Sequence, residues 1–220
     1  MGKLIAVVGA SGVGKTTLVR ALAKAFPPVL PTMHRDDPGT ARQGMCVSSL
    51  EGFQTAYEGH ADRPFQSLFK EDRRYALANQ IDYLLVCAEQ EKQLRASPHI
   101  GLMDGGLDLD FHGFTRLFHR RGLLTDAEFD LCRRLYHFLR ETLPPPDLFV
   151  QLCADEGTVA NRLSARDRIN IARAEDTALF NFFLEEWLAS MPSDQVLKLD
   201  VSKETLDYKR SIDLVLSRIQ

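Results

Sequence analysis

The sequence lacks the features that mark several common classes of protein. Its four cysteines, Cys46, Cys87, Cys132 and Cys153, form no CxxC pair, and no His/Cys spacing matches a zinc site. We therefore expect reduced thiols in a cytoplasmic protein. No apolar run approaches the length of a membrane span, and the N-terminal run is too short for a signal peptide. A net charge of −3 implies no general attraction to nucleic acid or to membranes.

What the sequence does contain is an alternation of short apolar runs with helical patterns. This alternation predicts a parallel sheet covered by helices on both faces. The expected strands are Leu4–Val8, Gly52–Tyr57, His99–Met103, Leu148–Leu152 and Val196–Leu199. The expected helices are Thr17–Phe26, Asp72–Leu94, Asp126–Leu143, Thr177–Ala189 and Glu204–Arg218. With 220 residues and 45% hydrophobic content, the chain suffices for one domain over residues 1–220.

A phosphate-binding loop follows the first expected strand. It fits the pattern G-x-x-x-x-G-K-[ST], and a helix follows it, as the mechanism of such a loop requires. Its backbone N–H groups and the helix N-terminus would hold the phosphates of ATP, while Lys15 reaches the outer phosphates and the Thr16 hydroxyl binds Mg²⁺. The expected nucleotide-binding residues are Gly9, Ala10, Ser11, Gly12, Val13, Gly14, Lys15, Thr16 and Thr17.

Two acidic residues follow neighbouring strand candidates. Ligands of open α/β sheets bind at the carboxyl ends of the strands, where Glu58 and Asp104 are expected. Glu58 could accept the proton of an attacking hydroxyl, and Asp104 could hold Mg²⁺. The plainer interpretations are a solvated glutamate and an exposed turn aspartate before Gly105.

Three arginines follow the fourth strand candidate. Arg162, Arg166 and Arg168 are spaced so that their guanidinium groups could converge on a triphosphate and on its transition state. The alternative is a solvated basic face. We assign them to an arginine-rich lid at about residues 162–173.

Residues 27–50 are rich in proline and glycine, and they are too long for an ordinary connection. We expect an irregular excursion there. It is either a plain surface segment, or a lid or partner contact on the substrate side, with His34, Arg35, Asp36 and Asp37 as its polar groups.

Five further segments, together with the phosphate loop, resemble the deoxynucleoside kinase family in the same order. They are residues 58–65, 69–87, 143–152, 162–168 and 196–201. The resemblance implies a three-layer P-loop kinase fold with a five-stranded parallel sheet in the order 2-3-1-4-5, and a homodimer formed through long helices. It also implies phosphorylation of a nucleoside hydroxyl, with Glu58 as the base, Gln80 facing the substrate and Asp110 near the nucleobase.

The chain departs from the family at four positions on the substrate side. A family arginine after the third strand is replaced by Gly105, and a second arginine, on the long helix, is replaced by Cys87. Phe69 replaces the tyrosine that contacts the sugar, and Ile171 lies where a glutamate is expected. Each lost polar contact weakens binding of an ordinary deoxynucleoside by about 1–3 kcal/mol, so we expect an unusual acceptor. The residues that could compensate are Asn79, Asn170 and His60, along with the proline-rich excursion.

The sequence leaves three functions open. The first is an ATP- and Mg²⁺-dependent kinase for a nucleoside or nucleoside-like acceptor. The second is a nucleoside monophosphate kinase, with a cationic acceptor-phosphate site from Arg63, Arg73 and Arg74. The third is a nucleotide-binding regulatory or scaffold protein with little transfer activity, which the missing arginine at Gly105 supports.

Overall fold

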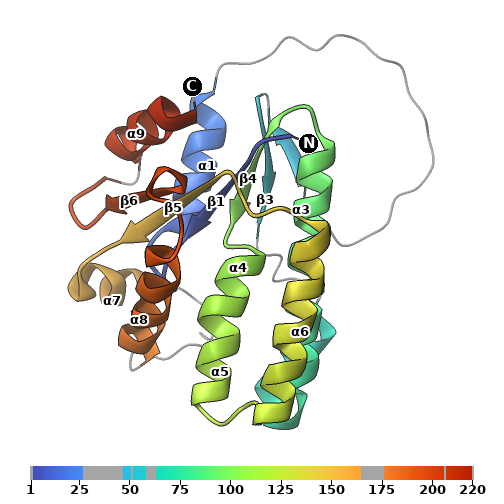
Figure 1. The fold of residues 1–220 in the computed structure, drawn as a ribbon. Coiled ribbons are helices and arrows are strands. Elements are labelled where there is room, and N and C mark those ends of the chain that lie inside the picture. The colour runs from blue at the N-terminus through green and yellow to red at the C-terminus, as the bar shows by residue number, and fades with distance from the viewer. Residues whose placement is uncertain are drawn as a thin grey trace.

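The described part of the protein is built around a six-stranded sheet (Figure 1). The computed structural model describes residues 2–26, 47–50, 52–57, 63–164, 176–205 and 207–219. The strand order is β2-β3-β4-β1-β5-β6, and every neighbouring pair is parallel except β2 with β3. Taken in chain order, the five parallel strands have the order 2-3-1-4-5, which confirms the predicted topology. The strands are β1 (Leu4–Val8), β2 (Val47–Leu50), β3 (Phe53–Ala56), β4 (Ile100–Asp104), β5 (Leu148–Cys153) and β6 (Val196–Asp200).

The edge strand β2 lies in the stretch that the sequence analysis assigned to an irregular excursion. It pairs antiparallel with β3, from Val47 opposite Ala56 to Leu50 opposite Phe53. Gly52, in the connection, has a φ of 107°, a left-handed conformation that short hairpin loops favour and that glycine adopts without strain. The last four residues of that stretch therefore extend the sheet, while residues 27–46 lie outside the described part of the chain.

The expected long helices are present, and the structure adds others. The segments at residues 64–71, 107–120 and 156–164 were not predicted as helices. The segment at residues 107–120 was not predicted because it contains or follows Gly105, Gly106 and Gly113, and glycine clusters ordinarily indicate turns. The bounds are α1 (Lys15–Ala25), α2 (Pro64–Glu71), α3 (Ala76–Ala96), α4 (Leu107–Leu109), α5 (Arg116–Arg120), α6 (Asp126–Thr142), α7 (Glu156–Ser164), α8 (Asp176–Ala189) and α9 (Lys209–Ile219).

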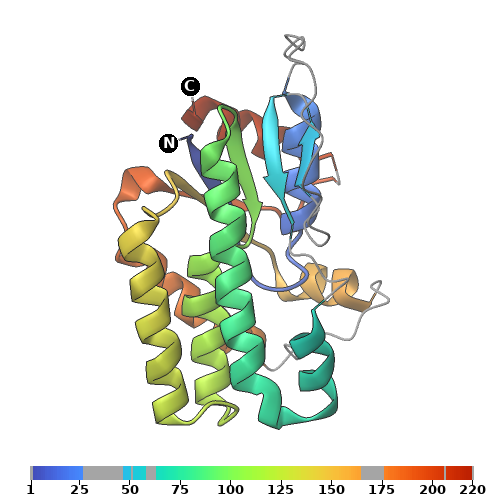
Figure 2. The ribbon, with the colours of Figure 1, turned by 90° about the vertical axis from the view of Figure 1, so that its right-hand side faces the viewer.

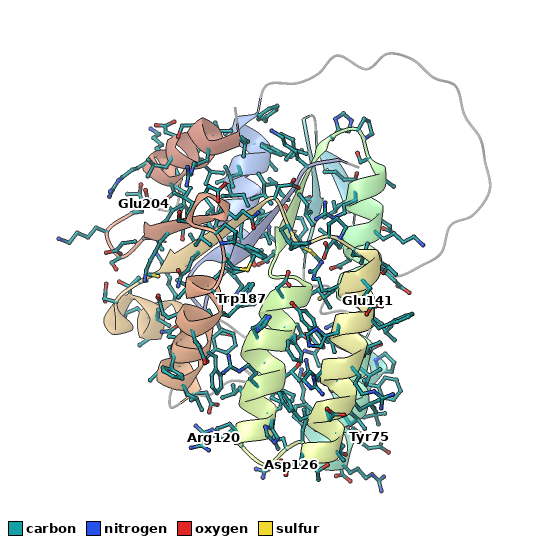
Figure 3. The ribbon with its side chains drawn as sticks, in the orientation of Figure 1. Tyr75, Arg120, Asp126, Glu141, Trp187 and Glu204 are labelled. Carbon is teal, nitrogen blue, oxygen red and sulfur yellow. The ribbon has the colours of Figure 1, made fainter. Side chains whose placement is uncertain are left out.

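The last helix begins five residues later than predicted. Glu204 belongs to the connection before α9, and its carboxylate accepts hydrogen bonds from the backbone N–H (2.9 Å) and the hydroxyl (2.5 Å) of Ser211. The helix starts directly after Tyr208, whose φ of 51° is left-handed and therefore not helical. Figure 3 labels Glu204 on this connection between β6 and α9.

Two layers of helices cover the sheet, as Figures 1 and 2 show. Side chains of β1 alternate between them. Ile5 and Val7 pack in a cluster with residues of α1 and α9, whereas Ala6 and Val8 pack on the opposite side with Trp187 and other residues of α8. This alternation explains the continuous apolar run of β1, because a parallel strand covered on both faces has no solvent-facing side.

The long helices α3 and α6 extend beyond the sheet, together with the segment from α4 to α5 (Figure 1). Between α4 and α5, Asp110–Thr115 (η2) has the wider π-helical turn, which is uncommon and occurs often at functional sites. Within the described ranges, no helix combines the length and the apolar character needed to cross a membrane.

Candidate functional site

The phosphate loop joins the end of β1 to the start of α1. Gly9, Gly12 and Gly14 have φ angles of 150°, 85° and 111°, which side-chain-bearing residues rarely adopt. These angles turn the chain back toward the helix, whose first hydrogen bond runs from the N–H of Leu18 to the carbonyl of Gly14 (3.0 Å). The predicted strand, loop and helix therefore form the arrangement in which a helix N-terminus can receive an anion.

Lys15 is held inside this loop. Its side chain is buried, and Nζ donates hydrogen bonds to the carbonyls of Gly9 (3.0 Å) and Ala10 (3.3 Å). Among the described residues, no carboxylate forms an ion pair with Lys15. A buried ammonium with only neutral carbonyl partners favours an anionic ligand, because a charge-assisted hydrogen bond is the stronger one.

The next residue reaches the neighbouring strand. The hydroxyl of Thr16 donates a hydrogen bond to Oδ2 of Asp104, the last residue of β4, whose side chain is buried. Two hard oxygen donors thus lie together beside the phosphate loop. This donor set fits Mg²⁺, which typically takes one or two protein oxygens and completes its coordination with water and substrate phosphates.

Two residues that are distant from the phosphate loop in the sequence, Arg162 and Tyr208, pack against it. Arg162, on α7, donates hydrogen bonds to the carbonyls of Val13 (2.6 Å) and Val201 (3.3 Å). A Cβ added to Gly14 would lie 2.1 Å from the Tyr208 hydroxyl, so any side chain at position 14 would displace Tyr208. Arg162 therefore fastens the phosphate loop to the connection before α9. No recognisable motif marks Tyr208 in the sequence, so it was not predicted.

Two of the three predicted substrate residues, Gln80 and Asp110, are in direct contact on the helical side of the sheet. Gln80 of α3 donates a side-chain hydrogen bond to Asp110, the first residue of η2, and both side chains are buried. The ring of Phe69 lies 5.2 Å from the ring of Phe118, centroid to centroid. A buried amide–carboxylate pair offers both a donor and acceptors to a polar ligand edge, and nucleobases present such edges.

The π-helical turn that carries Asp110 is fixed by aromatic contacts. His112 stacks on Trp187 with ring centroids 4.9 Å apart, and its Nε2 lies 3.2 Å from the hydroxyl of Tyr136. Figure 3 labels Trp187 where α8 faces α4. Burial lowers the pKa of His112 to about 4, so its imidazole is neutral at physiological pH and does not add charge beside Asp110.

A buried ionic network that the sequence analysis did not foresee holds the same turn. Arg140 of α6 pairs with Asp108 (2.6 Å) and with Glu91 of α3 (2.8 Å), and Tyr136 donates to Asp108 (2.7 Å). Burial alone would lower the pKa of Arg140, but the carboxylates of Asp108 and Glu91 raise it above its ordinary value. Arg140 therefore stays charged, and the network ties α3, α4 and α6 together two residues before Asp110.

Breaking this network should destabilise the protein. Replacing Arg140 with methionine leaves two buried carboxylates without their cation, and we expect the free energy of unfolding to fall by about 3–5 kcal/mol. Chemical denaturation followed by circular dichroism measures this loss. The control is Arg133→Met on the same helix, because Arg133 pairs with Asp130 where both side chains are about half exposed. Equal stabilities of the two variants would contradict a structural role for the network.

Three predicted catalytic residues, Glu58, Arg166 and Arg168, lie outside the described residues, as does Ile171. The structure places the nine residues of the phosphate loop, together with Asp104, on one side of the site. Gln80 and Asp110 form a second group, joined to the first by the six residues that follow Asp104, and Phe69 packs against Phe118. Within the described part of the chain, no group of three or more His, Cys, Asp or Glu side chains forms a metal site.

Several known proteins are similar to this chain. A deoxyguanosine kinase of Bacillus subtilis (strain 168) is 21% identical over 164 residues, covering 74% of this chain and 67% of that protein. A structure of deoxyadenosine kinase from M. mycoides with the products dCMP and dCDP superimposes with a TM-score of 0.72 at 18% identity, covering 98% of each chain. The same kinase with bound dATP gives a TM-score of 0.71 at 18% identity, again covering 98% of each chain.

These structures share the fold of this chain, and the family is established by the sequence itself. The sequence model of the family described as deoxynucleoside kinase matches residues 5–220, which is nearly the whole chain. The match includes the phosphate loop, Asp104, Gln80 and Asp110. The chain therefore belongs to the deoxynucleoside kinase family, whose members are phosphotransferases that act on an alcohol group.

Proposed function

We propose that the protein transfers the γ-phosphoryl group of ATP, with Mg²⁺, to a hydroxyl of a nucleoside or a nucleoside-like acceptor. One observation carries the proposal. The Thr16 hydroxyl is bonded to Asp104, and the segment after Asp104 leads within six residues to the Asp110–Gln80 pair. The phosphate loop, through Thr16, and the polar acceptor pair, through Asp110, are thereby attached to the two ends of one short segment, which supports direct transfer between two molecules held close together.

Each predicted site residue has a specific role in the proposed reaction. Lys15 binds the outer phosphates, and Mg²⁺, which supplies charge neutralisation when bound, would be held by Thr16 and Asp104. Glu58 accepts the proton of the acceptor hydroxyl. Arg166 and Arg168 stabilise the charge of the transferred group. Arg162, whose donors already hold backbone carbonyls, positions the phosphate loop.

The acceptor is a free nucleoside rather than a nucleoside monophosphate in this proposal. A monophosphate kinase needs a cationic site for the acceptor phosphate. Two of the three arginines considered for that site, Arg73 and Arg74, are exposed, and Arg74 is paired with Asp72 (3.1 Å) and lies over the ring of Tyr75. The scaffold alternative rests on Gly105, where the resemblance leads one to expect an arginine.

ADP formation from ATP and Mg²⁺ tests the proposal. The assay compares a panel of nucleosides and nucleoside monophosphates with a reaction that contains no acceptor. We expect ADP formation to rise above the acceptor-free rate with at least one nucleoside. If ATP binds but neither nucleosides nor monophosphates stimulate ADP formation, the protein is a nucleotide-binding scaffold. Stimulation by monophosphates alone would make it a monophosphate kinase.

We also propose that two chains associate through their long helices. Large apolar side chains remain exposed on α3 and α6, where the resemblance implied a homodimer: Leu85 is 43% exposed, Leu131 44% and Phe138 62%. Such a face favours association, because burying it removes apolar area from water. Light scattering on the eluting protein should give twice the chain mass of 24.8 kDa, and Phe138→Asp should shift it toward the single mass. A single mass for the unaltered chain would refute the dimer.

A further inference from the structure

Arg63 is a buried cation that sits just before α2. The residue is only 8% exposed, and its guanidinium carbon lies 3.2 Å from the centroid of the Tyr83 ring on α3. Gln66, in the first turn of α2, donates a hydrogen bond to the Tyr83 hydroxyl (3.1 Å). The aromatic ring is therefore held in place from α2, and Arg63 is stacked on a fixed platform.

The guanidinium group has donors that the protein does not use. Nη1 of Arg63 is buried and has no hydrogen-bond partner, and among the described residues no carboxylate forms an ion pair with it. The contact with the Tyr83 ring offsets part of the loss of hydration, but it provides no acceptor for the N–H groups. An unpaired buried donor on a charged group is unfavourable, so this geometry suits a ligand that brings an oxygen acceptor.

Arg63 stacks on the part of α3 that also carries Gln80, a member of the Gln80–Asp110 pair. Tyr83 is three residues after Gln80 and four before Cys87 on α3, so the three side chains neighbour one another on the same side of the helix. Cys87 is the position where an arginine was expected, and a thiol cannot replace its charge. Asn79, four residues before Tyr83, is 1% exposed, and its Oδ1 atom also lacks a hydrogen-bond partner.

We propose that Arg63 binds an oxygen atom of the acceptor and replaces the cation lost from Cys87 and Gly105. The oxygen is either a carbonyl oxygen of a nucleobase or an oxygen of a phosphate, since a guanidinium group donates to both. Asn79 Oδ1 accepts a hydrogen bond from an adjacent N–H of the same ligand. This assignment deepens the proposed function, on which it rests for the identity of the site.

Equilibrium binding tests this assignment without requiring turnover. Isothermal titration calorimetry would compare wild type, Arg63→Met and Arg63→Lys against deoxyguanosine, thymidine, deoxyadenosine and deoxycytidine, their 5′-monophosphates, and ATP. The matched control is Arg116→Met. Arg116 also lies over an aromatic ring, that of Phe183 at 4.2 Å, but it is already paired with Glu186 (2.5 Å).

We expect Arg63→Met to weaken the best-bound acceptor about 10- to 100-fold, while ATP affinity stays within about twofold. Arg63→Lys should be intermediate, because it keeps the charge and loses the planar fork, and Arg116→Met should bind as wild type does. A loss that spares deoxyadenosine, whose base has no carbonyl, but affects nucleosides with a base carbonyl locates the contact at that carbonyl. A loss confined to monophosphates locates it at a phosphate. Either pattern supports the Arg63 site, and the second also makes a monophosphate, not a free nucleoside, the acceptor.

Unchanged acceptor affinity in Arg63→Met would overturn the proposal, and so would a wild type that binds no member of the panel. If Arg63→Met fails to fold, the comparison of Arg63→Lys with wild type decides, and equal affinities reject the assignment. The proposed function is judged separately. Binding that depends on Arg63 without ADP formation refutes the kinase activity alone, whereas ADP formation that is indifferent to Arg63→Met and Arg63→Lys refutes the Arg63 site alone.

Discussion

Replacing Lys15 with alanine should lower kcat for phosphoryl transfer by about 10²- to 10³-fold, the usual effect of removing one preorganised donor from a developing charge. Lys15 is already buried in the phosphate loop, with Nζ held by the carbonyls of Gly9 and Ala10, so little reorganisation is needed when phosphates bind. ATP affinity should also fall, whereas adenosine affinity should hardly change, because Lys15 meets only the phosphates. Steady-state kinetics and calorimetry with both ligands measure these effects.

The control for this variant is Lys24→Ala. Lys24 lies in the last turn of the same helix, and its side chain is exposed. It should have wild-type kinetics, while the melting temperatures of both variants show whether α1 is intact. Normal ATP affinity and turnover in Lys15→Ala would rule out the phosphate-binding role of the loop.

Replacing Glu58 with glutamine should slow the chemical step by about 10²- to 10⁴-fold, because general-base catalysis typically contributes that much. The amide keeps the size of the side chain and removes the proton acceptor. ATP affinity should barely change, since the phosphate loop follows β1 and Glu58 follows β3. Single-turnover kinetics separate the chemical step from product release and so report the loss directly.

Glu71→Gln serves as the control, because Glu71 is an exposed glutamate at the end of α2. Near-normal turnover in Glu58→Gln would place the base elsewhere. Asp104 would then be the next residue to test. Its replacement by asparagine should affect Mg²⁺ dependence as well as rate, since its carboxylate accepts the Thr16 hydrogen bond.

The parts of the molecule that could be predicted from the sequence are those determined by short contiguous segments. The apolar run Leu4–Val8 became β1 with the predicted bounds, and the phosphate loop needed only its own residues and the helix after it. Asp104 was predicted because it follows a strand candidate, and Gln80 and Asp110 because the resemblance places such residues at matching points of the chain; their contact with each other was not predicted. Helix α6 began as predicted at Asp126, where Thr125 and Glu128 form a capping box.

The parts that were missed depend on contacts between distant segments. No local sequence pattern distinguishes Tyr208, yet its hydroxyl packs against Gly14, which lies 194 residues earlier in the chain. In the sequence, Arg140 looks like any exposed helical arginine, and only the fold places Asp108 and Glu91 next to it. The stacking of Arg63, just before α2, on Tyr83 of α3 likewise joins two segments whose relative placement no local pattern encodes. A charged residue in a sequence is ordinarily expected in solvent, and only the fold reveals that it is buried.

The most direct measurement is the identification of the product by mass spectrometry after incubation of the wild-type protein with ATP, Mg²⁺ and each nucleoside of the panel. We expect one phosphorylated nucleoside to form in equal amount to ADP, and to be absent when Lys15→Ala replaces the wild type. If calorimetry shows that ATP binds, yet no nucleoside gains a phosphoryl group above the Lys15→Ala background, then phosphoryl transfer to a nucleoside is not the function of this protein.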